Sequence, residues 1–183
     1  MAEQLGVSEM AGINSQQGIA GQYLTFELGD EVYGLQILKV QEIIGIMTVT
    51  RVPRTPSYVR GVINLRGKVI PVIELRTKFG MVNAEDTSRT CIIVVQVATE
   101  ADARGETGGS RRTTMGIIVD EVAEVLEVAS DQIEPAPSFG AAVPTEFILG
   151  MGKVGEKVVM LLDVDKVLSV GELAALHAAE GGT

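Results

Sequence analysis

The two halves of this chain carry the same pattern of residues, and this internal repeat constrains the fold more than any other feature of the sequence. Residues 61–74 align without a gap with residues 150–163 and keep glycine, lysine, apolar and acidic residues in matching places. A second block matches three residues of each half: Gly34, Val40 and Glu42 with Gly116, Val122 and Glu124. Two links marked by prolines, residues 53–56 and 135–137, are expected to form extended corners. Such self-similarity predicts two similar small barrels.

Each half consists of short apolar runs separated by turn residues. Residues 23–28 and 32–37 flank a Gly-Asp turn and predict a β-hairpin. Five further runs, several of them rich in valine and isoleucine, predict strands: residues 59–65, 69–75, 90–98, 114–119 and 157–163. Short strands at regular spacing are typical of a barrel or a sandwich, so the expected fold class is mainly β.

Two stretches do not fit the simple strand pattern. Valines recur at three-residue steps in residues 119–128, which suits a helix as well as a twisted strand. Pro71 lies inside the predicted strand 69–75 and cannot donate a ladder hydrogen bond, so it predicts an edge strand or a bulge. An edge strand is a place where another protein can dock.

The pattern divides the chain into three parts. Residues 1–21, rich in Gly, Ser and Gln, predict a mobile tail. Residues 22–168 form one domain with subdomains at about 22–85 and 86–168, between which strands could be exchanged, and residues 99–113 predict a flexible inserted loop. Residues 169–183 predict a short C-terminal helix and tail, because Glu172–Leu176 is rich in alanine and leucine.

The charge balance limits the classes of partner. With 24 acidic and 15 basic residues the formal net charge is −9, which disfavours nucleic acid and anionic membranes as partners. No signal peptide is predicted, because the first twenty residues lack Lys, Arg and a long apolar stretch. No run approaches the roughly 18 apolar residues of a membrane span. The single cysteine, Cys91, lies in an apolar run, which indicates buried packing and fits a reducing cytoplasm.

Few residues could support catalysis or bind a metal. The only histidine, His177, lies near the C-terminus, and one Cys with one His cannot make a zinc site. No Gly-rich phosphate loop is present, so no cofactor is expected. Glu74 and Asp163 occupy equivalent places and leave open a hydrolase that uses paired acids, although the chain has no Trp to form a sugar platform. An oligonucleotide-binding barrel is a second alternative, which the net charge and the scarce aromatic residues oppose.

The turn between the predicted strands 59–65 and 69–75 stands out. Its sequence Asn64-Leu65-Arg66-Gly67 would place Arg66 at an exposed hairpin tip, where a guanidinium group can bind a partner carboxylate in two places. The equivalent position of the second half is Gly155, so the fold itself does not require an arginine there. A solubilising surface charge explains Arg66 equally well.

The sequence resembles the CheW family along residues 21–168. The resemblance rests on the order and spacing of several segments: Leu38-Lys39-Val40-Gln41-Glu42-Ile43, the 53–56 corner, Gly61-Val62-Ile63-Asn64-Leu65-Arg66-Gly67, residues 69–76, 116–120, 133–137 and 161–168. It implies two five-stranded barrels of the SH3/OB type packed together with a third apolar core between them. The inserted loop and the acidic tail depart from the family pattern.

The resemblance also implies a function without catalysis. Members of the family are cytoplasmic scaffolds that link the histidine kinase CheA, through its regulatory domain, to the cytoplasmic hairpin tips of chemoreceptors (methyl-accepting chemotaxis proteins) in arrays at the inner membrane. Seven residues are carried over as protein-binding or organising positions: Val40, Glu42, Gly61, Asn64 and Arg66 in the first barrel, and Gly116 and Val125 near the groove between barrels.

Overall fold

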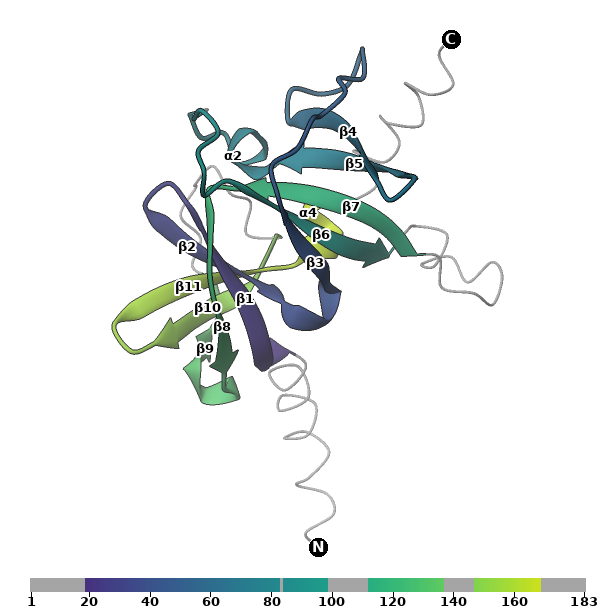
Figure 1. Cartoon of the computed structure of the whole chain (residues 1–183). Coiled ribbons are helices and arrows are strands. Elements are labelled where there is room, and N and C mark those ends of the chain that lie inside the picture. Colours follow the sequence, from purple (N-terminus) through teal and green to yellow (C-terminus); the bar gives the residue numbers. More distant parts are fainter. Residues whose placement is uncertain (1–18, 83, 99–111, 137–146, 169–183) are drawn as a thin grey trace, which may run out of the picture.

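The computed structural model describes residues 19–82, 84–98, 112–136 and 147–168, which form two β-sheets and a few short helices (Figure 1). The strands are β1 (Gly21–Leu28), β2 (Glu31–Gln36), β3 (Val40–Gly45), β4 (Val59–Leu65), β5 (Lys68–Glu74), β6 (Cys91–Ala98), β7 (Arg112–Val119), β8 (Glu121–Val128), β9 (Ile133–Glu134), β10 (Ile148–Val154) and β11 (Lys157–Leu162). The short helices are η1 (Ile37–Lys39), α2 (Leu75–Lys78), η2 (Ser130–Gln132) and α4 (Val164–Val167). This architecture confirms the predicted mainly β class.

Each sheet takes strands from both halves of the chain. The five-stranded sheet, called barrel 1 below, has the order β3-β6-β7-β5-β4, and the six-stranded sheet, called barrel 2, has the order β8-β1-β2-β11-β10-β9. The β1–β2 hairpin of the first half therefore lies in barrel 2, and the β6–β7 hairpin of the second half lies in barrel 1. Each exchanged hairpin joins the sheet of the other half through a parallel strand pair, β2 with β11 and β7 with β5. Strands are thus exchanged between the subdomains predicted at 22–85 and 86–168.

Three apolar cores result from this exchange. Barrel 1 encloses one core around Ile63 and Val94, barrel 2 encloses another around Tyr23 and Leu161, and a larger central core lies between the two sheets. Strands β1 and β6 are buried on both faces, because alternate side chains enter the central core and a barrel core. The three-core arrangement implied by the family resemblance is confirmed.

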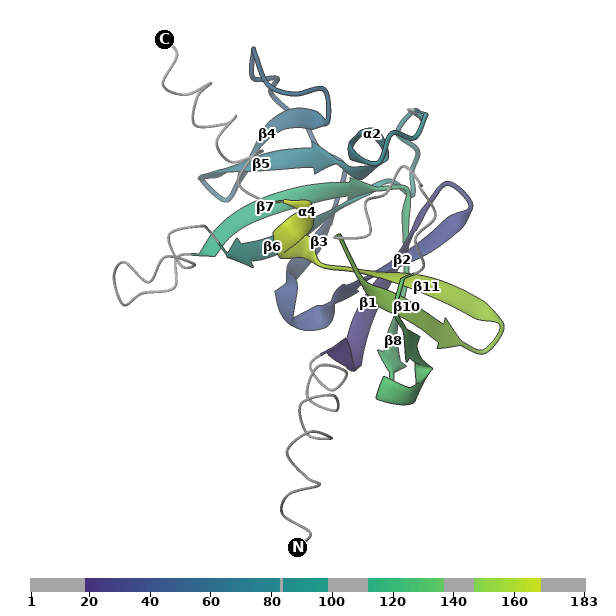
Figure 2. The same ribbon diagram turned by 180° about the vertical axis from the view of Figure 1, so that it is seen from behind.

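The repeat seen in the sequence is reproduced in the hydrogen-bonding register. In the β4–β5 hairpin Val59 pairs with Ile73, and the register shifts between Val59 and Gly61. In the β10–β11 hairpin Ile148 pairs with Leu162, with the same shift before Gly150. Both hairpins are followed by a one-turn helix, α2 and α4 respectively. In the view from behind, α4 lies against barrel 1, although it follows a strand of barrel 2 (Figure 2).

The stretch 119–128, whose valine spacing suits a helix or a strand, contains strand β8. The register with β1 shifts so that Val125 lies opposite Leu24 and Val122 lies opposite Phe26. Leu24 and Phe26 both face the central core, and the bulge therefore places valines three residues apart on one face.

Pro71 is expected from the sequence on an edge strand or at a bulge. The edge position is wrong, because β5 lies between β4 and β7, and the register shift of the β4–β5 pair falls opposite Val72 and Ile73, next to Pro71. Pro71 pairs with Val62, whose backbone N–H and C=O both bond Thr50 instead, at 2.8 Å each. The parallel ladder with β7 begins one residue later, at Val72 opposite Gly116. The missing N–H of proline therefore leaves both ladders intact.

Some elements carry too weak a signal for prediction, and some expectations fall outside the described residues. Strand β3 has no fully buried residue, and β10 contains two glycines, so neither is predicted from its sequence. The predicted tail helix, His177 and most of the inserted loop, residues 99–111, lie outside the described residues. Strand β1 begins at Gly21, and Ile19 packs against the core of barrel 2.

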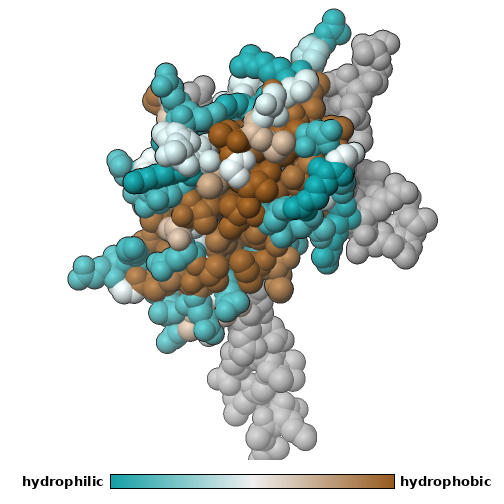
Figure 3. Space-filling model, viewed as in Figure 1, coloured by the Kyte–Doolittle hydropathy of each residue, from teal (hydrophilic) through white to brown (hydrophobic). Residues whose placement is uncertain are grey.

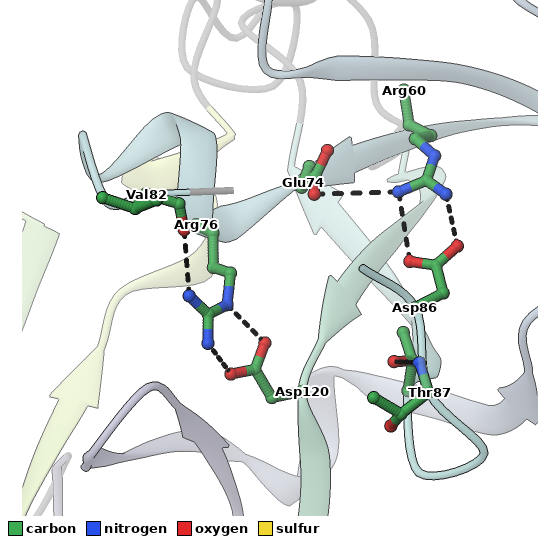
Figure 4. Close-up of polar contacts among 8 residues, drawn as sticks. Arg60, Glu74, Arg76, Val82, Asp86, Thr87 and Asp120 are labelled. Carbon is green, nitrogen blue, oxygen red and sulfur yellow. Dashed lines mark hydrogen bonds and ion pairs between the residues drawn. The ribbon is translucent and has the colours of Figure 1, made fainter. Parts of the chain in front are cut away.

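Ion pairs connect the two barrels, and those of Asp120 and Asp165 occupy matching places in the repeat. Arg76 in α2 donates to Asp120 through Nε, at 2.7 Å from Oδ1, and through Nη2 (Figure 4). Asp120 lies where the chain passes from barrel 1 to barrel 2, and it also accepts the backbone N–H of Gly29 at 2.8 Å. Lys39 and Asp165, 2.8 Å apart, make the corresponding contact between η1 and α4 with the charges reversed.

A lysine also lies between aromatic rings of the two barrels. The Lys78 Nζ is 4.3 Å from the centroid of the Tyr58 ring, just before β4, and 5.6 Å from that of Phe147, just before β10. Burial lowers the pKa of Lys78. Together with the ion pairs, this contact fixes how one barrel packs on the other.

The Asp120 contacts predict a pH-dependent contribution to stability. Burial alone would raise the pKa of Asp120, but hydrogen bonds from Arg76 and Gly29 outweigh it and hold the pKa below its ordinary value. A depressed folded-state pKa adds stability above the unfolded value of about 3.9 and loses it as the pH falls through the folded value. We expect Asp120→Asn to lower the free energy of unfolding by about 1–3 kcal/mol at neutral pH.

Urea unfolding at neutral and acidic pH measures this effect. The difference between the parent chain and the variant should shrink on acidification, because protonated Asp120 also loses its charged contacts. Asp131→Asn is the matched control, since Asp131 is exposed in η2. An equal loss of stability at both pH values would contradict this assignment.

Candidate functional site

Glu42 and Arg66 form an ion pair across barrel 1. The Arg66 Nη1 lies 3.0 Å from Glu42 Oε1, and the Nη2 lies 2.9 Å from Oε2, so the contact is bidentate. The Arg66 side chain is 74% exposed and that of Glu42 is 22% exposed. Arg66 lies at an exposed hairpin tip, as its sequence position predicts. The carboxylate that it binds in this structure is Glu42 of the same chain, where the sequence suggests a partner protein.

Local backbone geometry brings the two side chains together. The register between β3 and β6 shifts between Val40 and Glu42, so Glu42 lies opposite Val94, which faces the core of barrel 1. At the β4–β5 tip both turn residues have positive φ, 55° for Arg66 and 85° for Gly67. The Gly67 N–H donates to Asn64 Oδ1 at 2.9 Å and closes the turn. Asn64 therefore shapes the turn that presents Arg66.

Gly61 lies near the start of β4, where barrel 1 is closed by a contact with Thr50. Its φ is +146°, and a Cβ at this position would lie 2.1 Å from the carbonyl oxygen of Thr50. Thr50 forms a two-hydrogen-bond bridge with Val62 and so joins the chain after β3 to β4. In barrel 2 a Cβ at Gly150 would lie 2.7 Å from the Ile133 side chain and 3.1 Å from the carbonyl oxygen of Glu134, both in β9. Glu42, Gly61, Asn64 and Arg66 thus all line the seam along which barrel 1 closes.

The other predicted residues lie elsewhere. Val40 is half-buried against the central core, and Val125 on β8 is 48% exposed. Gly116 is buried against Val72 and Ile92, so the structure places it in the core of barrel 1 and away from the groove between barrels. A side chain there would displace these core residues, which is a packing requirement.

An apolar band crosses the face on which β3 and β1 lie. Figure 3 shows hydrophobic surface running over this face between hydrophilic rims. Among the exposed apolar side chains of the described residues are Ile43 on β3, 43% exposed, and Val125 on β8, 48% exposed. An apolar surface with a polar rim is typical of a protein-binding site.

The carboxylates considered for acid catalysis have structural partners. Glu74 lies 3.7 Å from Arg60 Nη1, and Asp163 accepts the backbone N–H of Lys166 at the start of α4. Within the described ranges, no group of three or more His, Cys, Asp or Glu residues is arranged to hold a metal ion. None of the helices in the described part of the chain has the length and hydropathy to cross a membrane. Cys91 is half-buried at the margin of the central core.

Known proteins resemble this chain along most of its length. The family model for the CheW-like domain matches residues 22–172. The chemotaxis protein CheW of Klebsiella aerogenes is 40% identical over 170 residues, which cover 90% of this chain and 95% of that protein. The probable chemotaxis protein CheW of Rhizobium etli is 32% identical over 154 residues, 84% and 91% of the two chains. The crystal structure of the scaffolding protein TtCheW from Thermoanaerobacter tengcongensis superposes with a TM-score of 0.69 at 31% identity, covering 84% of this chain and 90% of that one.

The seam geometry predicts different costs for two glycine substitutions. Gly61→Ala would push a Cβ into the Thr50 backbone and break the closing bridge, so we expect a loss of about 3 kcal/mol or more in the free energy of unfolding. Gly67→Ala is the matched control, because Gly67 also has a positive φ but has nothing within 4 Å of the added Cβ. We expect it to cost about 1 kcal/mol. Urea unfolding compares the two, and equal losses would contradict the role given to Gly61.

Proposed function

The chain belongs to the CheW family of chemotaxis proteins, and we propose that it couples chemoreceptors to the histidine kinase CheA through the seam of barrel 1 and the adjoining apolar band. Proteins of this family are scaffolds, and this chain is an adaptor and not an enzyme. In this proposal the receptor tip and the regulatory domain of the kinase bind separate surfaces of one rigid body. The protein works in the cytoplasm and joins receptor arrays at the inner membrane.

The observation that carries the proposal is that the fold does not account for Arg66. A non-glycine residue in the left-handed region costs about 1–2 kcal/mol, and an exposed ion pair contributes only about 0–1 kcal/mol. The equivalent turn of barrel 2 has Gly155 at φ 63°. Stability alone would favour glycine at the β4–β5 tip as well. Arg66 is therefore best explained by contact with another protein.

The apolar band supplies the second part of the proposed interface. Side chains such as Ile43 and Val125 offer apolar contact area, while the Glu42–Arg66 pair at the seam fixes the orientation of a partner through charge-assisted hydrogen bonds. A helical hairpin tip that carried apolar and acidic side chains together would suit this combination.

Coupling requires that the complex distinguish between receptor states. An adaptor that binds both states of the receptor with equal affinity would leave the kinase equilibrium unchanged. We propose that a rigid pair of barrels holds receptor and kinase in a fixed geometry, so that a shift in the receptor alters the geometry at the kinase. The cross-barrel contacts of Asp120 and Lys78 supply that rigidity.

The proposal is tested by reversing the charge at the hairpin tip. We expect Arg66→Glu to reduce receptor-dependent kinase activity by about tenfold or more, since a partner carboxylate would then face a like charge. The measurement is kinase autophosphorylation with receptor fragments, CheA and the purified chain. Undiminished activation together with full receptor binding would remove Arg66 from the mechanism.

A double variant separates partner contact from the internal ion pair. Glu42→Arg combined with Arg66→Glu keeps an opposite-charge pair at the seam, so we expect parental stability but still defective coupling. Full recovery of coupling in the double variant would show that the pair serves the fold of barrel 1 alone.

A further inference from the structure

A second surface of barrel 1 lies at the opposite end of β4 from Arg66. Residues 51–60, between the Thr50 bridge and the start of β4, line a hollow of about 600 Å³. Three arginines border it together with apolar side chains: Arg51, Arg54, Arg60, Val52, Pro53 and Pro56. The seven residues of β4, at roughly 3.3 Å each, separate this corner from the hairpin tip by about 20 Å. The corner is therefore a separate surface.

One of the three arginines is held in place by acidic neighbours. Arg60 donates to both oxygens of Asp86, with its Nη1 3.3 Å from Oδ1, and it lies 3.7 Å from Glu74 (Figure 4). Hydrogen bonding to Asp86 raises the pKa of Arg60. The charge of Arg60 is thus largely compensated, and its guanidinium group forms a fixed wall of the hollow.

The other two arginines have no such partner. Arg51 and Arg54 are both exposed, and no acidic residue in the described part of the chain pairs with either of them. They place two uncompensated positive charges three residues apart in the sequence of a protein whose formal net charge is −9. Such a local reversal of sign attracts acidic groups and not the phosphate backbone of a long nucleic acid, which the rest of the surface repels.

Arg54 resembles Arg66 in its backbone. Its φ is 62°, and it follows Pro53 in a turn that Thr55 closes by donating its hydroxyl to the carbonyl of Val52 at 2.8 Å. Proline followed by a residue of positive φ is the pattern of a type II turn, in which glycine is favoured at the third turn residue, the place that Arg54 occupies. Arg54 and Arg66 are the only non-glycine residues with positive φ in the described ranges. The fold gives no reason for an arginine at this strained position.

We propose that the 51–60 corner binds an acidic peptide segment of a partner protein. The peptide places carboxylates on Arg51 and Arg54 and an apolar side chain against Val52 and the two prolines. A small inorganic anion would use only the guanidinium groups and leave the apolar wall in water. A peptide that alternates acidic and apolar residues satisfies both parts of the hollow.

The probe is a fluorescein-labelled octapeptide of alternating glutamate and leucine, titrated with the full chain at low ionic strength and followed by fluorescence anisotropy. Arg54→Gly removes the charge while suiting the turn, so the variant keeps its fold. We expect it to weaken binding about tenfold or more, the effect of one lost charge-assisted contact. Arg112→Gln is the matched control, because Arg112 is exposed on β7 away from the corner, and it should leave the affinity unchanged.

Three outcomes would overturn the proposal: no binding of the peptide, equal binding by the parent chain and Arg54→Gly, or complete displacement of the peptide by millimolar inorganic phosphate. The Arg66→Glu variant keeps these tests separate from the coupling function, because it should bind the octapeptide as the parent does. Loss of octapeptide binding in Arg66→Glu would also count against a separate corner site.

Discussion

The central apolar core between the two barrels is the constraint on which the rest of the structure depends. Strands β1 and β6 each bury one face in this core and the other in a barrel, so each sheet needs a hairpin from the other half of the chain. Neither half can complete a barrel alone. The Arg76–Asp120 and Lys39–Asp165 pairs then fix the angle between the sheets. A scaffold that works by geometry requires this rigidity.

Much of the fold follows from local sequence pattern. The hairpins and the repeat could be predicted, because apolar alternation and turn residues are local signals, whereas the three-core architecture was implied only by the family resemblance. The valine spacing of residues 119–128 stays ambiguous in the sequence, since a bulge imitates the helical period. The interior position of Pro71 depends on a hydrogen-bonding pattern set by Thr50, which no local signal reveals. The pairing of exchanged strands is likewise a long-range property.

The candidate site is predictable only in part. The turn sequence is sufficient to place Arg66 at an exposed tip, and the comparison with Gly155 indicates that the fold does not require it. Its pairing with Glu42 is not predictable, because a bulge in β3 decides which face that carboxylate occupies. Gly61 and Gly116 are packing positions, and their role becomes clear only from the atoms that an added Cβ would meet. Prolines mark the 53–56 corner in the sequence, but its strained turn and unpaired arginines are visible only in three dimensions.

The central claim is that the two barrels form one mechanical unit. Differential scanning calorimetry of the purified chain tests it most directly. The account predicts a single unfolding transition whose calorimetric and van't Hoff enthalpies agree, because melting either barrel exposes the shared core. Two resolved transitions, each assignable to one barrel, would contradict it.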